Sequence, residues 1–141
     1  MTAGQGSEGS SSERDGGVGR GVRVLIADDD PKILATLAIL LRDHSFEVEL
    51  VRGGIDVMMA VANFRPHGVL LDLAMPDRSG FDLAEELSRR YGERCPMLIA
   101  VTAHDTADDR QMAEISGFHH FVPKPFNAAA MLRLLASLAK R

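Results

Sequence analysis

The sequence is poor in cysteine, in concentrated positive charge and in long apolar runs. Cys95 is the only cysteine among the 141 residues, which excludes an intramolecular disulfide. The net charge of -4, with no cluster of Lys and Arg, gives no general attraction to nucleic acid or anionic membranes. No stretch resembles a secretory signal or is apolar over the length that a membrane span needs. We therefore expect a cytoplasmic protein with neither a nucleic-acid nor a membrane partner.

The remaining composition is that of an ordinary globular domain. Hydrophobic residues make up 45% and charged residues 26% of the chain, and its length suits one domain with a hydrophobic core. Residues 1–20 differ in composition from the rest of the chain and read MTAGQGSEGSSSERDGGVGR. This stretch of Gly, Ser and charged residues has almost no apolar side chain to bury. We predict a flexible tail over residues 1–20 and one folded domain over residues 21–141.

Short β-branched runs alternate with helical patterns after the tail. Strands are predicted at 22–27, 46–51, 67–71, 97–101 and 118–122. Helices are predicted from apolar residues at helical spacing: Ile33, Leu34, Leu37, Leu40 and Leu41 on one face; Ile55, Met58, Met59 and Ala62; Phe81, Ala84 and Leu87 inward; and Met112 and Ile115 as a buried face. Thr106 shows a capping-box pattern, and Asn127 caps a last helix that runs to about Lys140. Five strands, each followed by a helix, predict an α/β fold with a parallel sheet covered on both faces, a three-layer sandwich.

Polar residues follow four of the predicted strands. Asp28 and Asp29 follow the first, Asp72 the third, Thr102 the fourth, and Lys124 stands one residue beyond the fifth. Ligands of open α/β sheets bind beyond the carboxyl ends of the strands, where the strand order reverses. A single polar residue after a strand is usually only the start of a loop, but the joint pattern indicates a site.

The chemistry of that site follows from its charges. If the first and third strands are neighbours, Asp29 and Asp72 converge, and their repulsion raises both pKa values unless a cation intervenes. Mg²⁺ suits such an oxygen-only set, and Lys124 adds a fixed positive charge. A carboxylate placed between two cations can act as a nucleophile toward phosphorus, because both offset charge on the phosphoryl oxygens. The predicted product is an aspartyl phosphate.

Four segments resemble those of bacterial response-regulator receiver domains. They are VLIADDDP, VLLDLAMPDRSGFDL, LIAVTA and FVPKPF, and the resemblance covers essentially everything after about Gly21. The spacing is 43 residues from Asp29 to Asp72, 30 to Thr102 and 22 to Lys124, all within the family's usual range. The resemblance implies a doubly wound, flavodoxin-like sheet of five parallel strands in the order 2-1-3-4-5.

The resemblance also implies a role for each site residue. Asp72 is similar to the phosphoacceptor, Asp28 and Asp29 to the acidic pair, and Asp29 to a direct Mg²⁺ ligand. The backbone carbonyl of Ala74 would complete the protein's share of the metal shell. Thr102 would donate its hydroxyl to the phosphoryl group and Lys124 would form an ion pair with it.

The resemblance also implies roles for residues around the site. Phe121 stands where the family has an aromatic switch residue that responds to Thr102. Lys124-Pro125 resembles the family's cis peptide, which an X-Pro bond makes accessible. Ala74 and His104 flank the site at positions that tune hydrolysis, so the phosphorylated lifetime stays open. For His104, a solvated loop residue is the alternative.

As a receiver, the chain would take a phosphoryl group from a histidine kinase or histidine phosphotransfer protein and catalyse only its own phosphorylation and slow dephosphorylation. The output would be a repacked surface over the helix that starts near Thr106, strand 118–122 and the last helix. That helix has more apolar residues than one buried face needs, so some are expected to stay exposed for a downstream protein or a second copy; alternatively, Ala and Leu simply favour helix. Because the chain ends after this helix, we expect a stand-alone receiver.

Two rival functions remain open from the sequence. Haloacid-dehalogenase-type phosphatases also use a strand-end Asp with Mg²⁺, but their second Asp, two residues on, is replaced here by Ala74. A receiver that takes no phosphate would serve only as a docking module. The intact set of Asp28, Asp29, Asp72, Thr102 and Lys124 argues against that reading.

Overall fold

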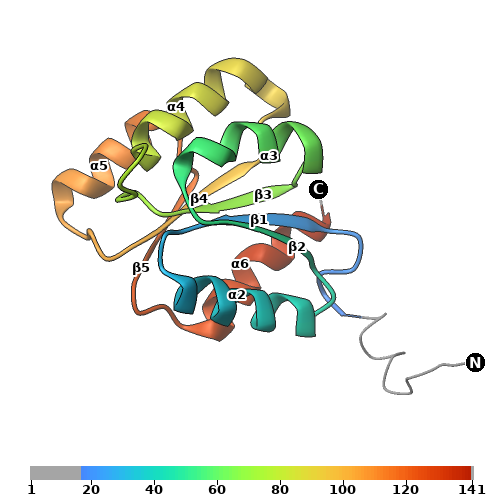
Figure 1. The fold of residues 1–141 in the computed structure, drawn as a ribbon. Helices are drawn as coiled ribbons and strands as arrows, with labels where there is room; N and C mark the ends of the chain where they lie inside the picture. The colour runs from blue at the N-terminus through green and yellow to red at the C-terminus, as the bar shows by residue number, and fades with distance from the viewer. Residues whose placement is uncertain (1–16, 141) are drawn as a thin grey trace, which may run out of the picture.

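The computed structural model describes residues 17–140 and places five parallel strands in one sheet (Figure 1). The strands are β1 (Arg23–Ala27), β2 (Glu47–Val51), β3 (Gly68–Leu71), β4 (Met97–Thr102) and β5 (His120–Pro123). Their order is β2-β1-β3-β4-β5 and every neighbouring pair is parallel. The predicted doubly wound sheet and its 2-1-3-4-5 order are therefore confirmed. The order reverses between β1 and β3, at the crevice where such folds bind ligands.

Five helices cover the two faces of the sheet. They are α2 (Pro31–Asp43), α3 (Val57–Phe64), α4 (Gly80–Tyr91), α5 (Ala107–Ser116) and α6 (Ala128–Ala136), with short 3-10 turns η1 (Gly54–Asp56), η2 (Gly92–Arg94) and η3 (Ser137–Lys140). Figure 1 shows α2 and α6 on one face and α3, α4 and α5 on the other. Among the described helices, none combines the length and the apolar composition of a membrane span.

Helix starts agree with the capping residues in the sequence. Asp30 caps α2 by accepting a hydrogen bond from the backbone N–H of Lys32, and Pro31 occupies the first helical turn. Thr106 forms the predicted capping box with Asp109, and Asn127 caps α6 through the N–H of Ala130. These three helices therefore begin at caps that the sequence contains.

Alternate residues of the central strands feed two separate cores. Leu25, Val69 and Leu98 face the α3, α4 and α5 side, whereas Ile26, Leu70 and Ile99 face the α2 and α6 side. All six are at most 1% exposed, as expected for parallel strands covered on both faces. This two-sided burial fixes the register, because a slip by one residue would exchange the two cores.

The predicted buried face of α5 is wrong. Met112 is 49% and Ile115 is 71% exposed, and the buried residues are Ala113 and Ser116. The cause is the close approach of α5 to α4, because a Cβ on Gly117 would lie 2.3 Å from Ser88 Oγ. Only small side chains fit between the two helices, so the larger apolar side chains point outward.

The predicted inward face of the second helix is also partly wrong. Ile55 and Met59 are more than 70% exposed, and α3 instead buries Val57, Ala60 and Val61. Ile55 belongs to the 3-10 turn η1, which has three residues per turn. A helical period counted from Ile55 therefore selects the wrong face.

The last helix buries more of its apolar residues than predicted. Met131, Leu135 and Leu138 are at most 4% exposed, and Leu132 and Leu134 are half-buried against the same core. The α-helix ends at Ala136 and continues as η3, which turns Leu138 over the start of β3. Within residues 128–139, no large apolar side chain is fully exposed.

The predicted tail falls mostly outside the described residues. Residues 1–16 lie there, whereas residues 17–20 form a turn on the folded body. The backbone N–H of Gly19 donates to the carbonyl of His44 at 2.8 Å, and a Cβ on Gly19 would meet the ring of Phe46. This turn leads the chain directly into β1.

A histidine extends the hydrogen-bonded ladder at the start of β3. The backbone N–H of Arg23 donates to Nδ1 of His67 at 3.0 Å, and the N–H of His67 donates to the carbonyl of Arg23 at 2.8 Å. Burial and the charge of Arg23 lower the pKa of His67 below its ordinary value. The folded protein therefore favours the neutral ring, whose Nδ1 can accept.

We predict that His67 makes the free energy of unfolding depend on pH. Because the folded-state pKa is lowered, the contribution is present above the unfolded pKa of about 6.5 and is lost as the pH falls through the folded value. Substitution His67→Asn keeps an acceptor near Nδ1 but removes the titration. Denaturant unfolding at a series of pH values between 8 and 5 should show a smaller loss of stability in His67→Asn. Parallel curves for the two proteins would contradict this role.

Candidate functional site

The residues selected at the strand ends meet at one edge of the sheet. Asp28 and Asp29 follow β1, Asp72 follows β3, Thr102 is the last residue of β4 and Lys124 follows β5. All strands are parallel, so their carboxyl ends lie at the same edge. The structure thus brings together residues that are up to 96 positions apart in the chain.

Three carboxylates form the centre of this site. One oxygen from each of Asp28, Asp29 and Asp72 lies within 4.8 Å of the other two. Asp28 is 2% and Asp72 is 6% exposed, whereas Asp29 faces solvent. The predicted convergence of Asp29 and Asp72 is present, and Asp28 joins them. An all-oxygen set with one open side fits a hard divalent cation.

Lys124 connects the fifth strand to the first and third. Its Nζ donates to Oδ2 of Asp28 at 2.8 Å and lies 3.5 Å from Oδ2 of Asp72. Burial raises the pKa of Asp28, as does the nearby charge of Asp72, against the lowering effect of the hydrogen bond from Lys124. Burial alone would lower the pKa of Lys124, but the hydrogen bond to Asp28 and the charges of both carboxylates raise it. The ammonium is therefore fixed in its charged form.

The loop after β3 is held tightly against Asp72. The backbone N–H of Ala74 lies 3.3 Å from Oδ1 of Asp72, and the N–H of Gly80 donates to the carbonyl of Leu73. A Cβ on Gly80 would lie 2.4 Å from the backbone oxygen of Asp72. Glycine at the start of α4 allows this approach, which keeps the loop that contains Ala74 next to Asp72.

Asp77 anchors the same loop and was not singled out from the sequence. Its carboxylate accepts hydrogen bonds from the backbone N–H groups of Ile55 and Gly54, at 2.8 and 2.9 Å. These bonds hold the pKa of Asp77 below its usual value. The sequence offers no local sign of this contact, because its partners lie 22 and 23 residues earlier.

Thr102 is fully buried and linked to both neighbouring segments. Its Oγ1 accepts a hydrogen bond from the N–H of His104 at 3.2 Å, and its carbonyl accepts one from the N–H of Lys124 at 2.9 Å. His104 itself is exposed in the loop after β4. The Lys124-Pro125 peptide bond is cis.

Phe121 contacts a partner that sequence reasoning missed. The ring is half-buried on β5, and the Arg110 guanidinium of α5 lies 4.6 Å from its centroid. Arg110 also forms an ion pair with Asp105 at 2.6 Å, in the loop that carries His104. Arg110 therefore joins the loop after Thr102 to the ring of Phe121.

We predict that Lys124→Met lowers the free energy of unfolding at pH 7 by about 2 to 3 kcal/mol, because it leaves two buried carboxylates without their cation. The pKa of Asp28, already raised, should rise further, so the folded variant holds a proton more readily than the unfolded chain. The deficit is then present at neutral pH and shrinks as the pH falls toward that pKa. Denaturant titrations at pH 5 to 8 measure it, with exposed Lys32→Met as control. Equal stability of the two variants at pH 7 would contradict the ion-pair role.

Comparison with known proteins agrees with this geometry. Residues 24–136 match the family model of the response regulator receiver domain. The chain is 32% identical over 120 residues to the response regulator MprA of Mycobacterium sp. strain KMS, covering 85% of this chain and 51% of that protein. The chain thus spans about half the length of the curated relatives it matches.

Solved structures share the fold. One is the receiver domain of the sensor histidine kinase PA1611 from Pseudomonas aeruginosa, with a magnesium ion coordinated in its active-site cleft (TM-score 0.77, 26% identity, 86% of this chain and 99% of that one). Another is the Saccharomyces cerevisiae Ssk1 receiver domain in complex with the histidine phosphotransfer protein Ypd1 (TM-score 0.78, 22% identity, 84% and 89% covered). With its sheet order, its strand-end residues and the family match, the chain belongs to the response regulator receiver domains.

Proposed function

We propose that Asp72 accepts a phosphoryl group from a histidine kinase or histidine phosphotransfer protein. The observation that carries this proposal is the charge balance of the site. Three carboxylates share one ammonium, which leaves a net charge of about two negative units at a largely buried edge. A divalent cation balances that charge and leaves Asp72 beside two positive centres.

Asp28, Asp29 and Asp72, with the backbone carbonyl of Ala74, would hold Mg²⁺. The donor atoms are all oxygens, two of the three carboxylates are buried, and no His or Cys belongs to the cluster. The magnesium-bound Pseudomonas receiver supports the choice of metal. When bound, the ion would offset negative charge on the phosphoryl oxygens.

In phosphoryl transfer, the remaining residues mainly position the reacting groups and offset their charge. An oxygen of Asp72 attacks phosphorus, the P–N bond of the donor phosphohistidine breaks, and the nitrogen keeps the electron pair. The donor ring, which carries a proton on its other nitrogen, leaves as neutral imidazole. Lys124, already 3.5 Å from Asp72, would pair with the transferred group, and the Thr102 hydroxyl would donate to it. The chain would thus catalyse only its own phosphorylation and slow dephosphorylation.

The output of phosphorylation would be a change around Thr102 and Phe121. In this structure the Thr102 hydroxyl oxygen accepts from the backbone N–H of His104, and its own hydrogen can donate to a phosphoryl group, so Thr102 would link that group to the loop after β4. Movement of this loop would shift Asp105, which is ion-paired with Arg110. It would therefore change the contact between Arg110 and the ring of Phe121. A two-state rearrangement of this region is the proposed switch.

The proposed output surface covers α5, β5 and α6. Met112 and Ile115 are large apolar side chains exposed on α5, and a hollow of about 230 Å³ between α5 and β5 includes Phe121 in its lining. This surface would bind a downstream protein or a second copy of the chain. The yeast Ypd1 complex supports a phosphotransfer protein as the phosphoryl donor.

Phosphorylation can be tested directly with a small acyl phosphate and Mg²⁺. Intact mass should show one added phosphoryl group that hydroxylamine removes and that Asp72→Asn abolishes, because the nucleophile is then an amide. Asp56→Asn changes an exposed carboxylate outside the cluster and should react like the unchanged protein. No adduct, where a known receiver reacts, would sink the proposal and leave a docking module. Continuous phosphomonoester turnover would instead indicate a phosphatase.

Magnesium should stabilise the unphosphorylated protein, because it relieves repulsion among the three carboxylates. We expect millimolar Mg²⁺ to raise the unfolding temperature by a few degrees, on the order of 1 kcal/mol, if its concentration exceeds its dissociation constant severalfold. Asp29→Asn should remove most of that shift, whereas Asp56→Asn should keep it. The measurement is a thermal melt with MgCl₂ against one with NaCl of equal ionic strength. Equal shifts in the two variants would argue against a metal at the cluster.

A further inference from the structure

Helix α3 has apolar side chains on its outer side as well as on its inner side. Val57, Ala60 and Val61 are buried in the core. Ile55, in the turn η1 that leads directly into the helix, is 73% exposed, and Met59 is 71% exposed. A helix that is apolar all round is usually covered on both sides, so the outer side of α3 is a candidate contact surface.

The exposed apolar residues of α3 lie on one face. Ile55, Met59 and Ala62 follow one another at intervals of four and three residues, which keeps side chains on the same side of a helix, and Ala62 is exposed as well. We call these three residues the α3 stripe. The neighbouring helix α4 has no such stripe, because all of its exposed positions are charged: Asp82, Glu85, Arg89 and Arg90.

The α3 stripe is separate from the proposed output surface. Helix α4 packs against both α3 and α5 and lies between them, as Figure 1 shows. Helix α3 is at the end of this layer, over β1 and the edge strand β2. The outer side of α3 is therefore open to a partner that does not contact α5 or β5.

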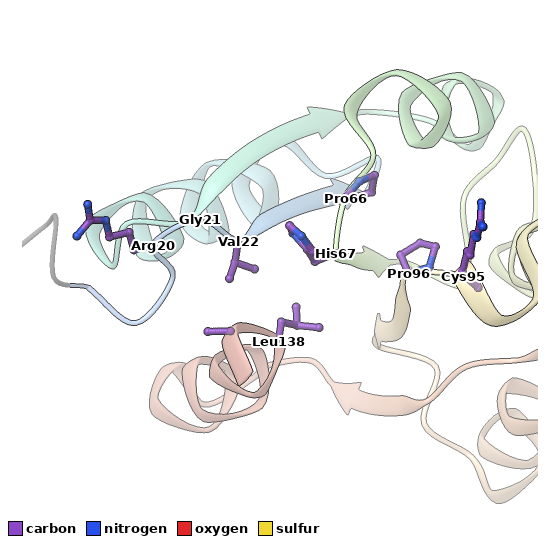
Figure 2. Close-up of a pocket in the computed structure, with 10 residues that line it drawn as sticks. Arg20, Gly21, Val22, Pro66, His67, Cys95, Pro96 and Leu138 are labelled. Carbon is purple, nitrogen blue, oxygen red and sulfur yellow. The ribbon is translucent and has the colours of Figure 1, made fainter. Parts of the chain in front are cut away.

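The hollow at the amino ends of the strands offers no comparable apolar surface. It has a volume of about 410 Å³, and Figure 2 shows Val22 and Leu138 bordering it from opposite sides. Both residues are only 4% exposed, so an occupant would remove little further apolar area from water. Arg20 and Arg94 also line this hollow, without an Asp or Glu, so two copies of the chain would repel each other there.

The charges around the α3 stripe allow a second copy of the chain to approach. They are of both signs, because Arg52, Asp56 and Arg65 are all exposed. Asp56 and Asn63 are seven residues apart, about two helical turns, and so lie on the same side of the stripe. In an antiparallel pair of α3 helices, Asp56 of one copy lies near Asn63 of the other, whose amide can donate to the carboxylate. The two-fold symmetry of a dimer forms this contact twice.

The side chains of the stripe are also complementary in size. If the two-fold axis passes between the levels of Met59 and Ala62, each Met59 lies beside Ala62 of the other copy. A large side chain next to a small one fills the space between two helices, and the flexible thioether of methionine adapts to it. The stripe is therefore suited to its own copy in size as well as in charge.

We propose that the α3 stripe binds the α3 stripe of a second copy in an antiparallel, two-fold symmetric contact. Three exposed side chains and their neighbours bury less than the roughly 800 Å² per partner of a stable interface, so we expect a weak dimer, with a dissociation constant of about 0.1 to 1 mM. The contact lies away from Asp72 and does not depend on phosphorylation. It is thus independent of the proposed function.

Dilution of the full ¹⁵N-labelled chain, without Mg²⁺ or a phosphoryl donor, tests the proposal. Backbone amide shifts of η1 and α3 should change over about two decades of protein concentration around the expected dissociation constant. Sedimentation equilibrium should show an average mass that rises over the same range. Met59→Glu should weaken association at least about tenfold, because it places a charge in an apolar contact. Ile39→Glu adds the same charge at a 65% exposed position of α2 and should leave association unchanged.

Substitution of Asn63 tests the antiparallel arrangement. Asn63→Lys should tighten the dimer at least about twofold, because its ammonium meets Asp56 of the other copy, and Asn63→Asp should weaken it by a similar factor. The NMR spectra of all variants show whether they are folded. Equal weakening by the two Asn63 variants would contradict the antiparallel contact.

Two further results would overturn the proposal as a whole. One is a chain that stays monomeric over the entire concentration range, which would leave the stripe to a different protein. The other is association that Met112→Glu abolishes and Met59→Glu does not, because the copies would then meet at the proposed output surface.

Discussion

The ion pair between Lys124 and Asp28 organises the carboxyl edge of the sheet. It joins the end of β5, the strand at one side of the sheet, to the end of β1 across β3 and β4, and it lies beside Asp72. Burying two carboxylates is costly unless a cation accompanies them. Lys124 supplies only part of the compensation, so the folded protein keeps an unsatisfied demand for positive charge. The proposed binding of Mg²⁺ and the proposed phosphorylation of Asp72 both rest on that demand.

The sequence predicts the sheet, and which residues meet at its carboxyl edge, because both depend on where the strands end. Apolar runs that stop at Asp28, Asp72, Thr102 and Lys124 give the strands and also the residues at their carboxyl edge. Parallel pairing then brings those residues together without any knowledge of side-chain packing. Caps at Thr106 and Asn127 are equally local, and the structure has both.

Features set by contact between elements could not be predicted in the same way. The exposure of Met112 and Ile115 depends on how closely α5 approaches α4, which is determined by Gly117 and Ser88. The stacking of Arg110 on Phe121 joins two elements whose sequences show no shared pattern. In each case the relevant information is a distance between elements, which residue spacing does not contain.

The three clustered carboxylates at one edge of the sheet and several arginines at the other give the domain an electric axis along its strands. Carboxylates gather at one end, with further acidic residues in the loops there, and arginines line the other. Such a molecule experiences a torque near a charged surface, so it becomes oriented relative to a charged partner before the two make contact. A partner with positive charge around its phosphorylated histidine would meet this protein with Asp72 already facing it, and added salt would slow their encounter more than it weakens the contact once formed.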